Sequence, residues 1–435
     1  MGLLGLGTVG GGTYRVLRRN AQLIADRAGR HIKICMVAVR DLARAAVLVD
    51  DDVVLTDDPL QLVQNPKLDV IVESIGGTRI ARELVMLAIA AGKHVVTANK
   101  ALLALHGTEI FSTARAKGVM VAYEGAVAVS IPIIKALREG LAANRVNWVA
   151  GVINGTTNFI LSEMNANGLD FDTALKLAQR KGYAEQDPTF DVDGTDAAHK
   201  LALLASNAFG IPLQFDCVHV EGIRAVAQRD VEFAKRLGFA VKLLGVAQRT
   251  AGGISLRVHP ALIPSSNLLT HVEGSMNAVM VHGDAAGITM YYGAGAGGEQ
   301  TASAVIADLV DVARWMGLAH QHRVPHLAFQ ESATVGLPMV ALGDICFSYY
   351  LRVDLCCGSH GVDGLDQLLE SADVQLVQRE WLTSPGKSEF ATLLLLTAPG
   401  PQHNIDALVT AVEQQPGVLG PVKRMRIECL DGGAA

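Results

Sequence analysis

The sequence has little that would place the protein in a membrane or an oxidising compartment. Its six cysteines are scattered and form no C-x-x-C pair, so neither a disulfide framework nor a zinc site is expected. The amino terminus lacks a basic stretch followed by an apolar one, so no signal peptide is expected. No apolar run reaches the roughly 18 residues of a spanning helix. These absences predict a soluble protein of the reducing cytoplasm.

Charge of either sign is also sparse. Charged residues make up 18% of the chain, and the net charge is −6. A mildly acidic protein offers no electrostatic surface for nucleic acid or for acidic membranes. Half of the 435 residues are hydrophobic, which argues against disorder, and the length allows two or three domains. Small-molecule substrates and protein partners are therefore favoured.

Glycine, by contrast, is abundant, and one cluster of it forms a nucleotide-binding pattern. A short apolar run turns into Gly5-x-Gly7-x-x-Gly10, and helix-like sequence follows over residues 13–28. In such a turn the first glycine allows the tight bend and the second lets the backbone approach a pyrophosphate. The third lets helix and strand pack closely. The pattern predicts a dinucleotide site at the start of the chain.

Strand-like and helix-like segments alternate over residues 1–127, which predicts a Rossmann-type doubly wound parallel α/β domain. Residues 128–318 predict an α+β catalytic and dimerisation domain, whose helix at about residues 299–316 packs back on the first domain. Residues 319–344 read as a linker, where three histidines are interpreted as structural rather than metal ligands. Residues 345–435 show strand–helix–strand–strand–helix–strand order.

The second expected strand ends in Val39-Arg40-Asp41. A carboxylate at this position binds the ribose 2′-hydroxyl of NAD, whereas an arginine can pair with the 2′-phosphate of NADP. Arg40 therefore favours NADP(H), while the adjacent Asp41 leaves NAD(H) possible. The alternative is that Arg40 is only a solvated loop charge.

An acidic stretch over residues 182–200 contains the best candidates for chemistry. Asp196 and Lys200 are four apart on an expected helix, so they share one face. A surface ion pair is the alternative, but this helix is otherwise apolar, and burying charges is costly unless they are paired or used. Glu185 lies just upstream. The carboxylates could hold a substrate ammonium, and the lysine could move a proton at an oxygen that gains or loses hydride.

Four motifs in order carry a family resemblance: GLGTVG at residues 5–10, TANK at 97–100, GVINGTTN at 151–158, and the acidic stretch. Together they closely resemble homoserine dehydrogenase, in the monofunctional bacterial form with a carboxy-terminal ACT regulatory domain. The resemblance is specific as far as residue 344 and looser in the tail. It implies NAD(P)H-dependent reduction of L-aspartate 4-semialdehyde to L-homoserine, in threonine, methionine and isoleucine biosynthesis, by a homodimer or homotetramer.

The resemblance also implies roles for particular residues. Lys200 would transfer the proton, and Lys100 would act beside it near the nicotinamide. Substrate-binding positions fall on Glu185, Asp196, Tyr183, Gly155 and Thr156. Cofactor-binding positions fall on Gly5, Gly7, Thr8, Val9, Gly10, Arg40, Ser74 and Lys100. A sodium site built largely of backbone carbonyls falls on Glu124, Val127, Val129 and Ile131.

General acid chemistry suits a lysine in this position. An unperturbed lysine has a pKa near 10.4, so we expect Lys200 to donate at neutral pH without special tuning. In the oxidation direction it must first lose that proton, which favours alkaline conditions.

Two departures from the family pattern stand out. Ala128-Val129-Ser130 replaces a glycine-rich stretch beside the sodium site. Residues 354–359 replace the acidic-x-Pro-Gly-Val turn usual in ACT domains, so a weak or absent response to threonine is expected.

Two other functions compete with this interpretation. One is an amino-acid-sensing binding protein with an inactive dehydrogenase body, which the presence of Glu185, Asp196, Lys200 and Lys100 argues against. The other is a different semialdehyde- or amino-acid-linked dehydrogenase. An aldehyde dehydrogenase acting through a cysteine thiohemiacetal is disfavoured, because no cysteine has a recognisable nucleophile context.

Overall fold

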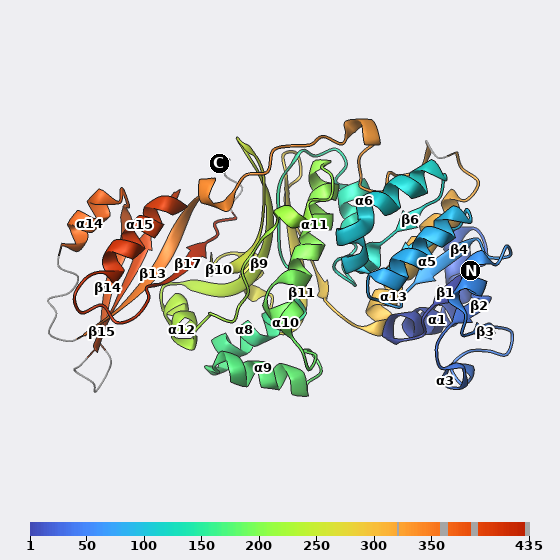
Figure 1. The fold of residues 1–435 in the computed structure, drawn as a ribbon, viewed down its shortest axis with the longest axis horizontal. Coiled ribbons are helices and arrows are strands. Elements are labelled where there is room, and N and C mark those ends of the chain that lie inside the picture. Colours follow the sequence, from blue (N-terminus) through green and yellow to red (C-terminus); the bar gives the residue numbers. More distant parts are fainter. Residues whose placement is uncertain (320–321, 357–363, 384–389, 431–435) are drawn as a thin grey trace.

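A computed structural model describes residues 1–319, 322–356, 364–383 and 390–430, and it arranges them as a row of three units (Figure 1). The amino-terminal unit and the carboxy-terminal tail lie at opposite ends, with the middle unit between them. Among the described residues, no helix is long and apolar enough to cross a bilayer.

The first unit is built on a six-stranded parallel sheet of order β3-β2-β1-β4-β5-β6. This is the strand order of a doubly wound dinucleotide-binding fold, so the predicted fold class is confirmed. Neighbouring residues of β1 face opposite sides, since Leu3 and Leu4 belong to different core clusters. The strands are β1 (Gly2–Leu4), β2 (Met36–Ala38), β3 (Val54–Thr56), β4 (Val70–Glu73), β5 (His94–Thr97) and β6 (Val121–Ala122).

Helices cover both faces of this sheet. Its helices are α1 (Thr8–Arg19), α2 (Ala21–Ala28), α3 (Leu42–Ala46), α4 (Pro59–Gln64), α5 (Arg79–Ala90) and α6 (Lys100–Ala116). The later helix α13 (Gly298–Trp315) packs with α1 and α2 on one face, and α4, α5 and α6 cover the other. The single helix expected over residues 13–28 is in fact two, because Asn20 leaves the helical conformation between them.

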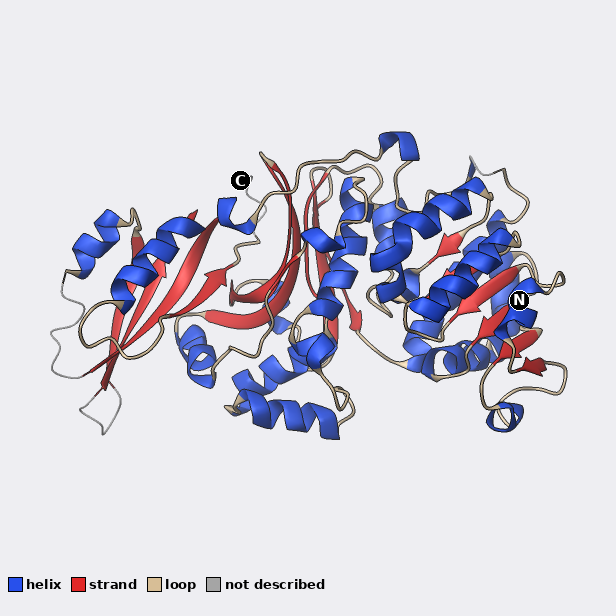
Figure 2. Cartoon of the chain, viewed as in Figure 1, coloured by secondary structure: helices blue, strands red, loops and turns tan. Residues whose placement is uncertain are grey.

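The middle unit contributes long strands to a second, eleven-stranded sheet, and they curve visibly in Figure 2. The strands are β7 (Val146–Val152), β8 (His219–Val220), β9 (Phe239–Thr250), β10 (Gly253–Pro264), β11 (Met276–Gly283) and β12 (Gly287–Ala294). The helices are α7 (Ile133–Lys135), α8 (Gly155–Asn167), α9 (Phe171–Arg180), α10 (Thr189–Val192), α11 (Thr195–Phe209) and α12 (Gln228–Arg236). Helix α11 lies between this sheet and α6 of the first unit (Figure 1), which places it at the junction of the two.

The tail shows the predicted βαββαβ order. It comprises β13 (Cys346–Cys356), α14 (Leu365–Ser371), β14 (Leu376–Thr383), β15 (Phe390–Thr397), β16 (Gly400–Pro401), α15 (Gln402–Glu413) and β17 (Lys423–Ile427). Its strand order is β17-β13-β15-β14, with its own core between sheet and helices. Residues 357–363, where the unusual ACT-type turn was expected, lie outside the described residues.

The tail is not attached by a linker alone. Three short segments share the outer edge of β10: Met339 pairs with Ile254, β8 pairs with the middle of the strand, and β17 pairs with Ala261 and Leu262. Tail and middle unit therefore form one sheet, which the sequence did not predict. Part of the expected linker is itself sheet-like, because Ile254 N–H donates to the Pro338 carbonyl at 2.9 Å.

Candidate active site

The glycine-rich turn has the shape that its pattern predicts. Gly5 has φ +91°, a left-handed conformation that glycine adopts without strain. A Cβ on Gly10 would lie 2.2 Å from the Gly5 carbonyl oxygen, so only glycine lets α1 pack this close. A Cβ on Gly7 would meet no atom within 4 Å. The backbone at Gly7 is thus open to a ligand at the amino end of α1, where helix N–H groups favour a phosphate.

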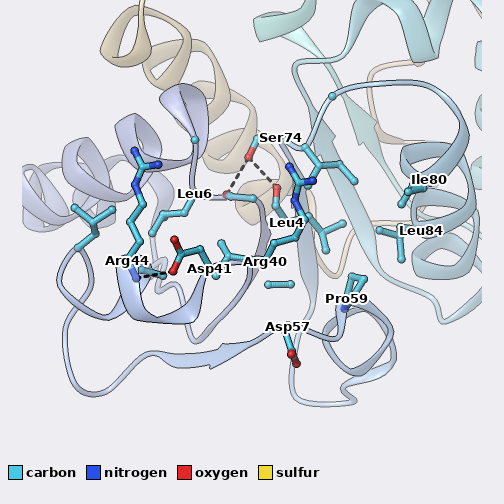
Figure 3. Close-up of a pocket in the computed structure, with 18 residues that line it drawn as sticks. Leu4, Leu6, Arg40, Asp41, Arg44, Asp57, Pro59, Ser74, Ile80 and Leu84 are labelled. Carbon is cyan, nitrogen blue, oxygen red and sulfur yellow. Dashed lines mark hydrogen bonds between the residues drawn. The ribbon is translucent and has the colours of Figure 1, made fainter.

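A pocket of about 610 Å³ adjoins this turn (Figure 3). It opens at the carboxyl ends of β1, β2 and β4, where nucleotides bind in open α/β sheets. Its lining includes Gly5, Gly7, Arg40, Asp41, Arg44, Ser74, Ile80 and Leu84. Ser74 Oγ lies 2.9 Å from the Leu4 carbonyl and 3.2 Å from that of Gly5, so it fixes the turn. The pocket therefore fits a dinucleotide.

Two arginines and one carboxylate stand at the end of β2. Asp41 caps α3, because its Oδ1 accepts the Arg44 backbone N–H at 2.9 Å. Arg40 and Arg44 are both exposed and both line the pocket, with no recorded acceptor for either guanidinium among the described residues. Two cations therefore face the pocket, together with Asp57 and with Asp41, whose carboxylate is engaged in the helix cap.

A buried glutamate connects the nucleotide pocket to the next part of the site. Glu73, at the end of β4, accepts the Thr97 hydroxyl at 2.5 Å, and burial raises its pKa. Asn99 donates to the Gly77 carbonyl at 2.7 Å and caps α6 by accepting the Leu102 N–H. The first residue of that helix is Lys100. The TANK motif thus ties the ends of β4 and β5 together and projects Lys100 from a fixed helix start.

Asp196 bridges two lysines at the junction of the first and middle units. Its Oδ2 lies 2.7 Å from Lys200 Nζ, and its Oδ1 lies 2.9 Å from Lys100 Nζ. Lys200 also donates to the Ile153 carbonyl at 2.7 Å. The predicted contact between Asp196 and Lys200 is therefore present, and α6 of the first unit adds the second cation.

Burial tunes the charges of this cluster. Burial, together with the nearby charge of Lys100, lowers the pKa of Lys200 below that of a free lysine. Although burial opposes it, the two ammonium groups hold the pKa of Asp196 well below its usual range. At Lys100, burial disfavours the charged ammonium, but the attraction of the Asp196 carboxylate outweighs this effect, so the pKa of Lys100 is raised. Lys200 is thus the lysine better suited to exchange a proton.

Sequence reasoning missed two groups that complete the cluster. Asn154 donates to Asp191 Oδ1 at 2.7 Å and to Asp196 Oδ2 at 2.9 Å, while its carbonyl oxygen caps α8. Burial and the charge of Asp196 raise the pKa of Asp191. Thr156 Oγ1 lies 3.1 Å from Asp191 Oδ2. The signal for Asn154 was its capping position, four residues ahead of Asn158 in the quoted motif.

The remaining predicted substrate residues surround this cluster less tightly. Gly155 begins α8 against Ser275, whose carbonyl oxygen would be 2.7 Å from a Cβ at that position. Tyr183 is exposed, with its ring 4.9 Å from that of Phe159. Glu185 is also exposed, and its carboxylate accepts no hydrogen bond from the part of the chain that the structure describes, but its charge helps to raise the pKa of Lys100. Glu185 is therefore free to meet a ligand.

The positions expected to bind sodium form a tight buried loop. The Val127 and Val129 carbonyl oxygens accept no hydrogen bond from any described residue, and Val127 is fully buried. Val129 has φ +52°, which is strained for a β-branched residue. The Glu124 carboxylate accepts the N–H groups of Ile134 and Lys135, both at 2.9 Å. Unpaired carbonyls in a strained loop fit a hard cation with oxygen ligands.

Side-chain clusters offer no alternative metal site. No group of three or more His, Cys, Asp or Glu side chains in the described part of the chain is arranged to hold a metal. His326, one of the three linker histidines, accepts the Val121 N–H at 3.1 Å and stacks on Phe111. It has a structural role, as expected. His320 lies outside the described residues.

Comparison with known proteins agrees with this geometry. The family profile described as "Homoserine dehydrogenase, NAD binding domain" matches residues 5–124, and that described as "Homoserine dehydrogenase" matches residues 132–310. Homoserine dehydrogenase of Pseudomonas aeruginosa is 51% identical over 432 residues, covering 99% of each chain. The crystal structure of a homoserine dehydrogenase from Thiobacillus denitrificans is 52% identical, with a TM-score of 0.93 over 99% of this chain and 98% of that one.

A more distant structure includes the nucleotide. A hyperthermophilic archaeal homoserine dehydrogenase in complex with NADPH is 26% identical, with a TM-score of 0.61 over 72% of this chain and 96% of that one. The matched profiles span both the nucleotide pocket and the two-lysine cluster. The chain belongs to the homoserine dehydrogenase family of NAD(P)-dependent oxidoreductases.

Proposed function

We propose that the protein interconverts L-aspartate 4-semialdehyde and L-homoserine with NADP(H), and that it serves threonine, methionine and isoleucine biosynthesis. The observation that carries this proposal is the Lys200–Asp196–Lys100 bridge beside the dinucleotide pocket. Reduction of an aldehyde needs a proton donor at the oxygen and a site for the nucleotide. This junction offers both.

Lys200 acts as the general acid. Its ammonium has three N–H groups, of which Asp196 and the Ile153 carbonyl take two, so one can meet the substrate oxygen. The nicotinamide, when bound, supplies or accepts the hydride. Negative charge that develops on the substrate oxygen is stabilised by the two ammonium groups, and Lys200 then donates its proton. In the reverse direction a neutral Lys200 accepts the hydroxyl proton, which its lowered pKa favours.

The substrate α-ammonium needs carboxylates that the lysines leave free. Asp196 is engaged by both lysines, whereas Glu185 is exposed and Asp191 bonds only to neutral groups. We therefore assign the α-ammonium to Glu185 and Asp191, with Tyr183, Gly155 and Thr156 around it. The carboxylates also fix the orientation of the aldehyde towards Lys200.

The activity is tested by following reduced nicotinamide absorbance with purified protein, homoserine and each oxidised cofactor in turn. We expect homoserine-dependent reduction with NADP as the better cofactor. Oxidation of a different amino-alcohol in preference to homoserine would favour the rival dehydrogenase function, and no oxidation of any would favour a binding protein.

Removal of the Arg40 guanidinium should weaken NADP(H) selectively. Only NADP presents a 2′-phosphate, and a charge-assisted hydrogen bond contributes about 1.5–3 kcal/mol, so KM for NADP should rise roughly 10- to 100-fold in Arg40→Ala. KM for NAD should change little. Arg82→Ala is the matched control, because that exposed arginine pairs with Glu109 and does not line the pocket. An equal loss for both cofactors in Arg40→Ala would make the residue structural.

Sodium should stabilise the protein more than potassium does. A ligand that binds only the folded state raises its stability in proportion to ln(1 + [L]/Kd), so the melting temperature should be higher in NaCl than in KCl at equal ionic strength. Val129→Gly is the matched variant: it relieves the positive φ but keeps the carbonyl ligand, so the sodium effect should persist. Identical melting curves in the two salts would show that the loop does not bind sodium.

Three further features remain predictions. A homodimer or homotetramer is supported by the edge strand β12, where Ile288 and Tyr292 are exposed, and its mass in light scattering tests it. The ACT assignment is supported by the βαββαβ order, and titration of activity with L-threonine tests it. A cytoplasmic location is tested by fractionation of cells.

A further inference from the structure

A surface segment supports the acidic loop from the side away from the lysines. We define the acidic loop as residues 187–194, which include α10, and the link segment as residues 219–224, which begin with β8. Ile223 N–H donates to the Val192 carbonyl at 2.8 Å. A Cβ on Gly222 would lie 2.4 Å from the same carbonyl oxygen. The link segment thus lies in direct backbone contact with the end of α10.

Side chains strengthen this contact. Arg224 donates through Nε to Asp193 Oδ1 at 2.6 Å and through Nη2 to Thr189 Oγ1 at 3.2 Å. It therefore clamps both ends of α10, the short helix that also carries Asp191. A shift of the link segment would move Asp191 relative to Asn154 and Thr156.

The link segment is bound in turn by the tail. Arg426 of β17 places Nη1 2.9 Å from both carboxylate oxygens of Glu221. The Arg426 side chain is only 6% exposed, and its guanidinium lies over the rings of Phe347 and Tyr349 at 5.7 and 6.0 Å. A cation buried in this way is stabilised by its carboxylate partner, and Arg426 Nη2 also donates to Gln402 Oε1 at 3.3 Å.

The same edge of β10 holds both partners in register. His219 pairs with Arg257, and Glu221 N–H donates to the Val258 carbonyl at 2.7 Å. The side chain of the same Arg257 makes two hydrogen bonds to Glu428, which directly follows β17, at 2.7 and 2.9 Å. The link segment and β17 are therefore neighbours on one rigid strand.

We propose that Glu221 and Arg426 are positioning residues for the substrate site, through which the tail holds the acidic loop in its binding geometry. The proposal rests on the proposed role of the acidic loop in binding the substrate ammonium. Neither residue touches the lysines; both act through the link segment on Asp191. The tail thereby contributes to the affinity for homoserine even without an effector bound to it.

The test compares Glu221→Gln, Arg426→Gln and the double variant in the full-length protein. Coupling through packed networks changes binding about 2- to 30-fold, so each single variant should raise KM for homoserine within that range. The kcat and the KM for NADP should stay within about twofold of wild type, since Lys200 and the nucleotide pocket are untouched. The double variant should be about as impaired as the worse single one, because both single variants break the same Glu221–Arg426 ion pair.

Arg424→Gln is the matched control. Arg424 lies two residues away on β17 but pairs with Asp406 inside the tail, so this variant should leave KM for homoserine unchanged. Should Arg426→Gln fail to fold, Glu221→Gln alone decides, because the Glu221 side chain is 41% exposed and glutamine has nearly the same size. An unchanged KM in Glu221→Gln, with or without a lower melting temperature, would show that the pair only attaches the tail.

Asp191→Asn, measured in the same assay, separates this proposal from the proposed substrate site. If Asp191→Asn raises KM for homoserine while Glu221→Gln does not, only the positioning role fails. If Asp191→Asn also leaves KM unchanged, the acidic loop does not bind the substrate and both assignments fall.

Discussion

Lys200→Ala is expected to lose about 10²- to 10⁴-fold in turnover while binding NADP as wild type does, because general acid–base catalysis typically contributes that much. The change removes the buried ammonium that bonds to both Asp196 and the Ile153 carbonyl, and it leaves the dinucleotide pocket untouched. Steady-state oxidation of homoserine and fluorescence titration with NADPH measure the two effects. A variant that keeps more than about a tenth of wild-type turnover would exclude Lys200 as the proton carrier.

The matched control is Lys242→Met. Lys242 is a second buried lysine, bonded to the Val272 carbonyl and to Asn158 Oδ1, and burial lowers its pKa to about 8. Its removal should reduce stability but leave kcat near that of wild type below the melting temperature. If Lys242→Met lowered kcat as much as Lys200→Ala does, the loss of activity would reflect the removal of a buried lysine in general and not a catalytic role of Lys200.

Asp196→Asn is expected to damage both stability and turnover. The neutral amide would leave the buried ammonium of Lys200 and the half-buried ammonium of Lys100 close together without an anion between them. Removing one partner of a buried ion pair typically costs about 3–5 kcal/mol of folding free energy. Urea unfolding and homoserine oxidation measure the two losses.

The pH dependence of the Asp196 effect has a defined sign. Because the folded-state pKa of Asp196 lies below its unfolded value, its stabilisation is present above about pH 4 and is lost as pH falls through the folded-state pKa. The stability gap between wild type and Asp196→Asn should therefore close at acid pH. Asp230→Asn is the control, since Asp230 of α12 is equally buried and pairs with Arg352 on β13 of the tail. It should cost stability without a matching loss of kcat.

Sequence patterns located β1, β2, β4, β5 and β6, because each lies in a short apolar run bounded by polar turns, but they did not locate β3. They missed α6, which follows Asn99. That helix is apolar on several sides and contains Gly107, a residue that usually weakens a helix. The structure explains the glycine: a Cβ there would lie 2.5 Å from a methyl of Leu213. A contact with a distant residue thus overrides the local preference, and no local pattern reveals it.

The long strands β9 and β10 were missed or shortened for a similar reason. Lys242 interrupts the apolar pattern of β9, yet it is buried because carbonyl and amide oxygens from other elements accept its hydrogen bonds. Gly245 interrupts it again, where a side chain would come within 2.9 Å of Ile153. Both exceptions depend on the tertiary structure.

The residues of the candidate site also fall into two groups: those that local spacing reveals and those that only the tertiary structure reveals. Asp196 and Lys200 could be found from their spacing, because four residues on a helix fix a contact in advance. Asp191 could not, since several aspartates crowd the acidic loop and only its approach to Asn154 and Thr156 distinguishes it. The involvement of Lys100 in the same ion pair also required the two units to be placed against each other.

The shared edge of β10 has a consequence for how the chain comes to be folded. The middle unit is synthesised before the tail, so the outer side of β10 at Ala261 and Leu262 lacks its partner until β17, the last strand of the described chain, has been made. An open strand edge can pair with another molecule instead. In a chain that stops after residue 343, this part of β10 would never gain its partner strand, and the buried Arg257 would lack the Glu428 carboxylate. Shortened chains should therefore aggregate during expression, so tail function is better studied by point substitution than by deletion.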